Sequence, residues 1–433
     1  MERYTEYKDS GVKWLGEIPS HWDMLAIKHI LRLKKEVVGK HSYQYDLLSL
    51  TLKGVIKRDM DNPEGKFPAS FDTYQVVEPN DFIFCNFDNE ETPRAVGLSS
   101  YKGMITGAYD VLYRNNPKLS DKFLIYYFLY IDDAKRFKPL YKGLRKTVPF
   151  DSFMSYKIPV PSLEEQNAMV AYLDSATSKI DEAISQQQKM IDLLNERKQI
   201  IINNAVIKGL DPNVKLKPSG INWIGDIPSH WETIRLGFCS WIRARLGWKG
   251  LKANEYVDNG YAFLSAFNIQ NNQLVWEPLN FINKFRYDES PEIKLKVGDI
   301  LLVKDGAGIG KCARVDSMPK GEATANGSLA FISPGEKMHY RYLYYFIISN
   351  SFRKYTELLI NGMGVPHFTQ GEMKKVKVPL PPKDEQIVIA DFLDSKVEKI
   401  NKTINHYQIQ ISFLQERKQI IINDVVTGKV KVV

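Results

Sequence analysis

SGVKWLGEIPSHWD at residues 10–23 returns as SGINWIGDIPSHWE at residues 219–232, with nine of fourteen positions identical. The octet ERKQIIIN at residues 196–203 returns unchanged at residues 416–423. The offset is 209 residues for the first pair and 220 for the second, so the second copy contains 11 additional residues between its motifs. Such self-similarity predicts that the chain consists of two copies of one structural plan.

A long helix is predicted at the end of each copy. Ser162 and Glu165 have the spacing of a capping box, and no glycine or proline interrupts the following residues until Gly209. The second helix follows Pro381 and Pro382 and ends before Gly428. Apolar residues alternate at intervals of three and four, which predicts a coiled-coil seam for helix pairing or partner docking: Leu173, Ile180, Ile184, Ile191, Leu194 and Ile201, then Leu393, Ile400, Ile404, Ile411, Leu414 and Ile421.

The two helices are expected to pair with each other. About 45 residues of helix would measure roughly 67 Å, and an unpaired helix would leave its apolar stripe in water. Because similar units connect the helices, the pairing should be antiparallel, with one variable domain at each end. Further apolar residues beside the seam, such as Met190 and Ile200, suggest an additional partner surface, although burial against the chain's own domains would also explain them.

The variable regions, residues 24–157 and 233–376, mix strand-like and helical segments. The strand-like runs are residues 81–87 and 299–304, and the helical runs are residues 121–136 and 339–355. We therefore predict a mixed α/β fold, in which a long antiparallel two-helix coiled coil separates two α/β domains in a pseudo-two-fold repeat. The predicted segments are 1–160 (first domain), 161–208 (first helix), 209–376 (second domain) and 377–433 (second helix and tail).

Composition narrows the classes of protein. Of the 433 residues, 59 are Lys or Arg and 51 are Asp or Glu, a formal charge of +8. The first domain carries 24 basic and 21 acidic residues (+3), and the second carries 21 and 16 (+5). Three scattered cysteines support neither a disulfide framework nor a zinc site and suit a reducing cytoplasm. The longest apolar runs are too short to span a membrane.

The excess positive charge permits a nucleic-acid partner. Lysine and arginine contact phosphates and base edges, so cations near loops and aromatic residues are our candidate DNA-binding residues. They are Lys34, Lys35, Lys40, Lys53, Arg94, Lys142, Arg145 and Lys146 in the first domain, and Arg243, Arg245, Trp248, Lys249, Lys304, Lys311 and Arg314 in the second. Solvated surface cations and core aromatic residues would produce the same pattern.

No complete catalytic motif or metal-ligand set is found. The glycine-rich segment 305–311 lacks the first glycine and the final Ser or Thr of a nucleotide-binding loop, so a tight turn or a loop near a DNA backbone is expected instead. His21 and His230 belong to the repeated motif and are expected to pack or cap rather than to catalyse. These absences favour a binding protein over a self-contained nuclease or methyltransferase.

The paired I-P-S-H-W motifs, the Pro-x-Pro-Ser/Pro-x-x-Glu-Gln segments at 159–166 and 379–386 and the ERKQIIIN octets resemble the specificity subunit of type I restriction–modification enzymes over essentially the whole chain. This resemblance implies two target-recognition domains that bind a bipartite double-stranded DNA site, and helices that dock two modification subunits. It implies no cofactor in this chain, with S-adenosylmethionine, ATP and Mg²⁺ on modification and restriction subunits. A stand-alone tandem DNA-binding regulator and a coiled-coil adaptor remain alternatives.

Overall fold

The computed structural model describes residues 2–60, 68, 70–245, 251–360 and 367–432. The chain forms two compact units. Unit 1 is Met1–Gln187 with Ile409–Val433, and unit 2 is Gln188–Gln408. The division falls inside both long helices, α3 (Leu163–Lys208) and α9 (Lys383–Val426), so each unit contains part of each helix. The two helices match the predicted positions and lengths.

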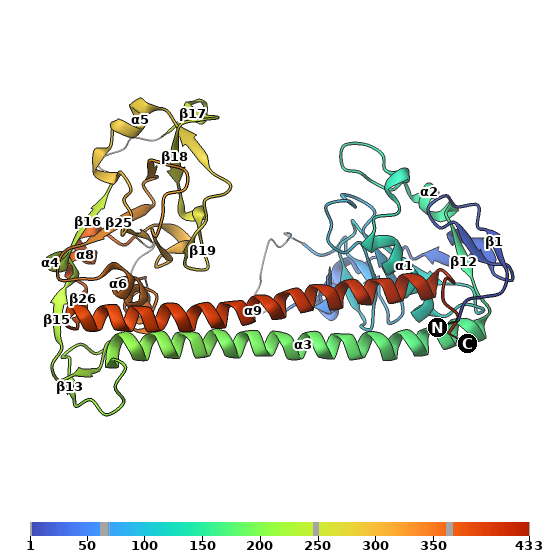
Figure 1. The fold of residues 1–433 in the computed structure, drawn as a ribbon. Helices are drawn as coiled ribbons and strands as arrows, with labels where there is room; N and C mark the ends of the chain where they lie inside the picture. The colour runs from blue at the N-terminus through green and yellow to red at the C-terminus, as the bar shows by residue number, and fades with distance from the viewer. Residues whose placement is uncertain (1, 61–67, 69, 246–250, 361–366, 433) are drawn as a thin grey trace. The chain divides into compact units, whose positions relative to one another are not determined.

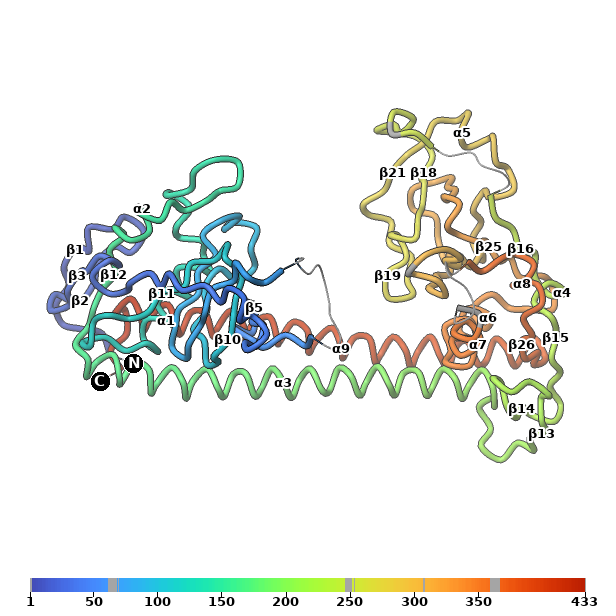
Figure 2. Tube along the Cα trace, turned by 180° about the vertical axis from the view of Figure 1, so that it is seen from behind, coloured from blue at the N-terminus to red at the C-terminus, as the bar shows by residue number. Residues whose placement is uncertain are grey.

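In both units a segment of α3 lies antiparallel to a segment of α9, as Figures 1 and 2 show. The N-terminal part of α3 pairs with the C-terminal part of α9 in unit 1, and the converse holds in unit 2. At the start of α3, Ser162 N donates to Glu165 Oε2 and Glu165 N donates to Ser162 Oγ, which confirms the capping box. The twelve seam residues are buried or half-buried.

Unit 1 is built on an antiparallel sheet in the order β4-β11-β8-β9. Its strands are β4 (Leu31–Leu33), β8 (Phe82–Phe84), β9 (Val96–Leu98) and β11 (Asp110–Arg114). Helix α1 (Asp121–Asp133) packs on this sheet through an aromatic core that includes Phe82, Phe84, Tyr127 and Phe128. The remaining elements are β1 (Tyr7–Asp9), β2 (Glu17–Pro19), β3 (Asp23–Ala26), β5 (Leu48–Thr51), β6 (Gly54–Lys57), β7 (Gln75–Val77), β10 (Gly103–Ile105), α2 (Phe150–Ser155) and β12 (Lys157–Val160).

Unit 2 repeats this plan with an antiparallel sheet in the order β16-β25-β22-β23. Its strands are β16 (Ser240–Ala244), β22 (Ile300–Val303), β23 (Cys312–Arg314) and β25 (Leu329–Pro334). A second sheet joins β17 (Tyr256–Val257), β18 (Tyr261–Leu264), β21 (Asn280–Ile282) and β24 (Ala323–Ala325). The other elements are β13 (Leu216–Pro218), β14 (Asp226–Pro228), β15 (Glu232–Arg235), α4 (Leu236–Cys239), β19 (Ile269–Gln270), β20 (Gln273–Leu274), α5 (Lys284–Asp288), α6 (Tyr340–Ile347), α7 (Asn350–Ile360), α8 (Gln370–Lys375) and β26 (Lys377–Leu380).

The predicted strand-like runs are confirmed by β8 and β22, and the helical run 121–136 by α1. The helical run 339–355 is also confirmed, and the structure divides it into two helices, α6 and α7, on either side of Ser349. The buried Ser349 hydroxyl donates to Phe346 O and accepts from Phe352 N, so it ends one helix and caps the next.

The N-terminal segment and the segment after α9 bond to each other in unit 1. Lys431 N donates to Glu2 O over 2.9 Å, and Tyr7 Oη donates to Gly428 O over 3.1 Å. Figure 1 shows the two termini close together at one end of α3. The segment after α9 therefore packs on the first repeated motif, just as Gly209 after α3 packs near Trp231 of the second motif.

Candidate nucleic-acid interface

The repeated His-Trp motif attaches each variable domain to the first turn of a long helix. Trp22 is fully buried and donates from Nε1 to Glu165 Oε1 over 3.3 Å, and His21 Nε2 lies 3.0 Å from the same oxygen. In the second copy the same contacts measure 3.0 and 2.9 Å and join Glu385 to Trp231 and His230. Although burial opposes ionisation, the bonds from His21 and Trp22 hold the pKa of Glu165 below its ordinary value. The motif is structural, as predicted.

A buried glutamine makes a second equivalent link in each copy. Gln166 accepts from Ser120 N at the start of α1 and donates to Lys118 O and Pro161 O. Gln386 makes the same set of bonds to His339, Lys337 and Pro381 beside α6. The Glu-Gln pair that ends both repeated segments, 159–166 and 379–386, was the sequence signal for this role.

Equivalent aspartates fix the domain helices further along α3 and α9. Asp174 accepts from Lys122 Nζ at 2.7 Å and from Tyr126 Oη at 2.8 Å. Asp394 accepts from Arg341 at 2.8 Å and from Tyr345 Oη at 2.6 Å. Although burial opposes ionisation, these donors hold the pKa of both carboxyl groups below its usual range. Each domain is thus oriented on its helix by a bonded carboxylate.

Two predicted DNA contacts, Lys34 and Arg243, lie instead at equivalent internal ion pairs. Arg243 has only 4% of its side chain exposed and lies 2.7 Å from Asp299, while Lys34 Nζ lies 3.0 Å from Asp81. Both aspartates also accept from a backbone N–H three residues earlier, at the turn that begins β8 or β22. Because these cations satisfy buried carboxylates, their placement argues against a DNA contact.

Four other predicted cations are also held by carboxylates with little exposure. Arg314 reaches Asp394 of α9 over 2.6 Å, so it ties the sheet of unit 2 to the helix. The others pair with acidic residues of their own domain: Arg94 with Asp132 and Asp133, Arg245 with Glu289, and Lys304 with Asp305. Each of these four cations therefore has a carboxylate partner within the fold, which explains its position without a DNA contact.

The remaining described candidates lie at the surface. They are Lys35, Lys40, Lys53, Lys142, Arg145, Lys146 and Lys311, of which Lys146 is half-buried. Lys53 lies in the turn between β5 and β6, and Lys142, Arg145 and Lys146 lie in one loop before α2. Trp248 and Lys249 lie outside the described residues. These surface cations remain predicted DNA contacts.

The glycine-rich segment after β22 is a tight turn. Gly310 N donates to Val303 O, Ile309 N to Gly306 O and Lys311 N to Gly308 O. Since these amides are bonded within the turn, they cannot together cradle a phosphate. Of the two expectations for this segment, the tight turn is confirmed.

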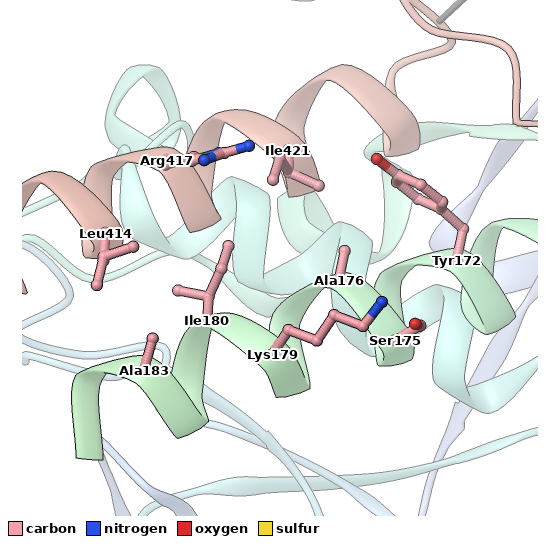
Figure 3. Close-up of a pocket in the computed structure, with 9 residues that line it drawn as sticks. All are labelled: Tyr172, Ser175, Ala176, Lys179, Ile180, Ala183, Leu414, Arg417 and Ile421. Carbon is pink, nitrogen blue, oxygen red and sulfur yellow. The ribbon is translucent and has the colours of Figure 1, made fainter. Parts of the chain in front are cut away.

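The paired helices leave apolar side chains in water at equivalent positions. Leu193 and Phe413, which are related by the 220-residue offset, are 57% and 64% exposed. Ile200 and Ile420, one heptad later, are 49% and 50% exposed. In unit 1 the two helices also border an open pocket of about 380 Å³ whose walls include Ala176, Ile180, Leu414, Arg417 and Ile421 (Figure 3). Each unit therefore carries an apolar helix face beyond its seam.

The described residues form neither a candidate metal site nor a helix that could span a membrane. The three cysteines are buried and separate, and burial raises the pKa of the Cys239 thiol to about 11. In the described part of the chain, no group of three or more His, Cys, Asp or Glu side chains could hold a metal ion. No described helix is long and apolar enough to cross a bilayer.

Comparison with known proteins identifies the repeat. Residues 103–191 and 228–411 match the family model for the type I restriction modification DNA specificity domain. The chain is 27% identical to the type I restriction enzyme MjaVIII specificity subunit of Methanocaldococcus jannaschii, over 98% of this chain and 97% of that one. It is 24% identical to the putative MjaX specificity subunit of the same organism, over 98% of both. A solved chain from a study of type I R-M complex assembly and conformational transition shares the fold, with a TM-score of 0.67, 16% identity and coverage of 95% of this chain and 99% of that one.

Proposed function

Because the chain belongs to the type I restriction–modification DNA specificity family, we propose that its two domains bind the two halves of one bipartite double-stranded DNA site, while its helices hold two modification subunits. Specificity subunits are the non-catalytic, DNA-recognising components of these complexes, and they act together with other subunits and DNA. The chain's own contribution is therefore recognition and assembly.

The equivalence of the two units is the observation that supports a bipartite site. Each domain is attached to a long helix by the same carboxylate, glutamine and aspartate contacts, while the loops of the two domains differ. Identical attachments with unlike loops suit two recognition surfaces that select different half-sites. The surface cations of each domain supply phosphate contacts, which position a protein on DNA without selecting sequence.

The duplicated apolar helix face supports two modification subunits. Leu193 and Ile200 in unit 2 correspond to Phe413 and Ile420 in unit 1, so one partner type can dock twice. Exposed apolar residues one heptad apart are typical of a face that accepts another helix. In this proposal the modification subunits carry S-adenosylmethionine, restriction subunits carry ATP and Mg²⁺, and the complex acts in the cytoplasm.

A chimera tests the proposal. The full chain is expressed with its modification subunit, and the methylated sequence is mapped by methylome sequencing. Exchange of residues 24–157 for the corresponding region of a relative should change one half of the mapped sequence and leave the other half intact. A chimera that altered both halves would contradict independent recognition. A wild-type complex that methylated no bipartite sequence would contradict the proposed function as a whole.

A further inference from the structure

Leu144 is fully exposed, at 102%, the highest value among the large apolar side chains in the described part of the chain. It lies at the tip of residues 142–147, here called the basic hairpin, which follow the 3-10 helix η3 (Lys138–Leu140) and precede α2. Lys142 N donates to Thr147 O over 2.9 Å and Thr147 N to Lys142 O over 3.0 Å. Figures 1 and 2 both show the teal segment beside α2 standing out from the body of unit 1.

A single exposed leucine is ordinary, but this one is held on a fixed support. Gly143 and Lys146 adopt left-handed backbone conformations, with φ of 69° and 44°. Residues 86–90, here called the acidic shelf, bond the backbone of the hairpin and of the residue after it. Asp88 N donates to Arg145 O, and Val148 N donates to Asn86 O, each over 2.7 Å. Tyr141 Oη also donates to Asn89 Oδ1 over 2.7 Å. Leu144 is therefore presented in a fixed position.

Cations surround the exposed leucine. Arg145 donates to Asp88 over 2.6 Å and its guanidinium lies 4.9 Å from the centre of the Phe87 ring, while Lys146 pairs with Glu90. The bond from Arg145 lowers the pKa of Asp88, and the bond from Lys146 lowers that of Glu90, so both shelf carboxylates are ionised at neutral pH. The side chains of Arg145 and Lys146 are still 67% and 43% exposed. Such exposed pairs are weak, because water screens them, and their cations can turn to another anion.

We propose that the basic hairpin enters a groove of the DNA, with Leu144 against base edges and with Lys142, Arg145 and Lys146 on the flanking phosphates. Apolar side chains distinguish thymine methyl groups in the major groove and act as wedges between base steps in the minor groove. The acidic shelf holds Arg145 and Lys146 beside the hairpin before DNA binds. This assignment rests on the proposed function and adds to it a residue that reads sequence.

A duplex suits this hairpin better than a protein does. A protein interface of ordinary stability needs a broad buried area with an apolar centre, whereas one leucine on a narrow hairpin offers little apolar area. A leucine between lysine and arginine side chains matches the alternation in DNA of apolar base edges and anionic phosphates. DNA is therefore the partner that the geometry favours.

The test uses the full chain assembled with its modification subunits. Binding to a duplex that carries the mapped methylation sequence is compared with binding to a scrambled duplex, at several salt concentrations. Leu144→Ala should reduce the preference for the mapped duplex about 10-fold without changing the salt dependence, because an apolar contact releases no counterions. Lys142→Gln should weaken binding to both duplexes alike and reduce the salt slope by about 0.9.

Leu52→Ala is the matched control, because Leu52 is also an exposed leucine (67%) in a hairpin turn of the same unit, between β5 and β6. It should keep the wild-type preference, and all three variants should unfold at the wild-type temperature. Undiminished preference in Leu144→Ala, an equal loss in Leu52→Ala, or loss of modification subunits from Leu144→Ala would each overturn the inference. A wild-type complex that bound the two duplexes equally would overturn both the inference and the proposed function.

Discussion

Lys418 Nζ of α9 lies 2.7 Å from both carboxylate oxygens of Asp181 of α3. The equivalent lysine of the other copy, Lys198, has no carboxylate at this position, because residue 401 is asparagine and Lys198 Nζ lies 3.0 Å from its Oδ1. Burial lowers the pKa of Lys198. The two contacts between α3 and α9 are thus at equivalent positions, but the Lys418 contact is an ion pair and the Lys198 contact is a hydrogen bond to a neutral amide.

Asn401→Asp should stabilise unit 2 by restoring the missing charge. An ion pair of this exposure contributes about 0.5–1 kcal/mol, which would raise the unfolding temperature by about 2 °C. The lowered pKa means that the folded chain binds the Lys198 proton more weakly than the unfolded chain, so this residue's contribution to stability increases as the pH rises. The substitution should reduce that increase. Calorimetry between pH 7 and pH 10 measures how the stability of each variant changes with pH. In unit 1, Asp181→Asn should lower stability, because it removes the equivalent ion pair. Destabilisation by Asn401→Asp would contradict this account.

Glu165→Gln should destabilise unit 1, because an amide has a single accepting oxygen. The carboxylate accepts from Trp22 and His21 on Oε1 and from Ser162 N on Oε2. Loss of hydrogen bonds to a charged group costs about 1.5–3 kcal/mol. Because the folded-state pKa of Glu165 is lowered, its contribution is complete above the unfolded pKa, about 4.3, and is lost as the pH falls through the lower folded-state pKa. Urea unfolding at pH 7 and below pH 4 should therefore show a smaller difference between variant and wild type in acid. Glu164→Gln, an exposed neighbour in the same turn, is the control and should unfold like the wild type.

Phe413→Asp should remove one modification subunit from the assembled complex, since a carboxylate on the apolar helix face would have to be desolvated on docking. Leu193→Asp should remove one as well, and the double variant should lose both. Native mass spectrometry of the co-purified complex counts the subunits. Glu398→Gln, on an exposed part of α9, is the control and should bind as many modification subunits as the wild type. Full assembly of the double variant would show that docking occurs elsewhere.

Arg243→Met should unfold the sheet of unit 2 rather than impair DNA contact. It leaves Asp299 buried without its partner, and breaking a buried pair costs about 3–5 kcal/mol. Thermal unfolding should show an early transition. Lys40→Gln, which changes an exposed cation, should unfold like the wild type and should weaken DNA binding. If Arg243→Met kept the wild-type unfolding temperature and lost DNA affinity, the predicted DNA role of Arg243 would be correct.

Features that depend on neighbouring residues could be predicted from the sequence. The long helices could be located from the capping residues Ser162 and Glu165 and from the apolar positions that begin at Leu173. Helix caps and seams depend on residues three and four positions apart, so they are visible in the sequence. The repeated His-Trp motif was correctly assigned a packing role. The break at Ser349 was missed, because it depends on a buried hydroxyl rather than on a glycine or a proline.

The sequence by itself determined the two-copy plan, the paired helices and the absence of catalytic motifs, since these depend on local patterns and on self-similarity. Only the tertiary structure decided which cations are available to DNA. Asp299 lies 56 positions after Arg243 in the sequence, and Asp394 lies 80 positions after Arg314, so folding pairs these cations with distant carboxylates. Lys142 and Arg145 stay in water because the hairpin carries them away from the core. A lysine or arginine at the surface cannot be distinguished in the sequence from one in an internal ion pair. The difference depends on whether the fold brings a carboxylate beside it.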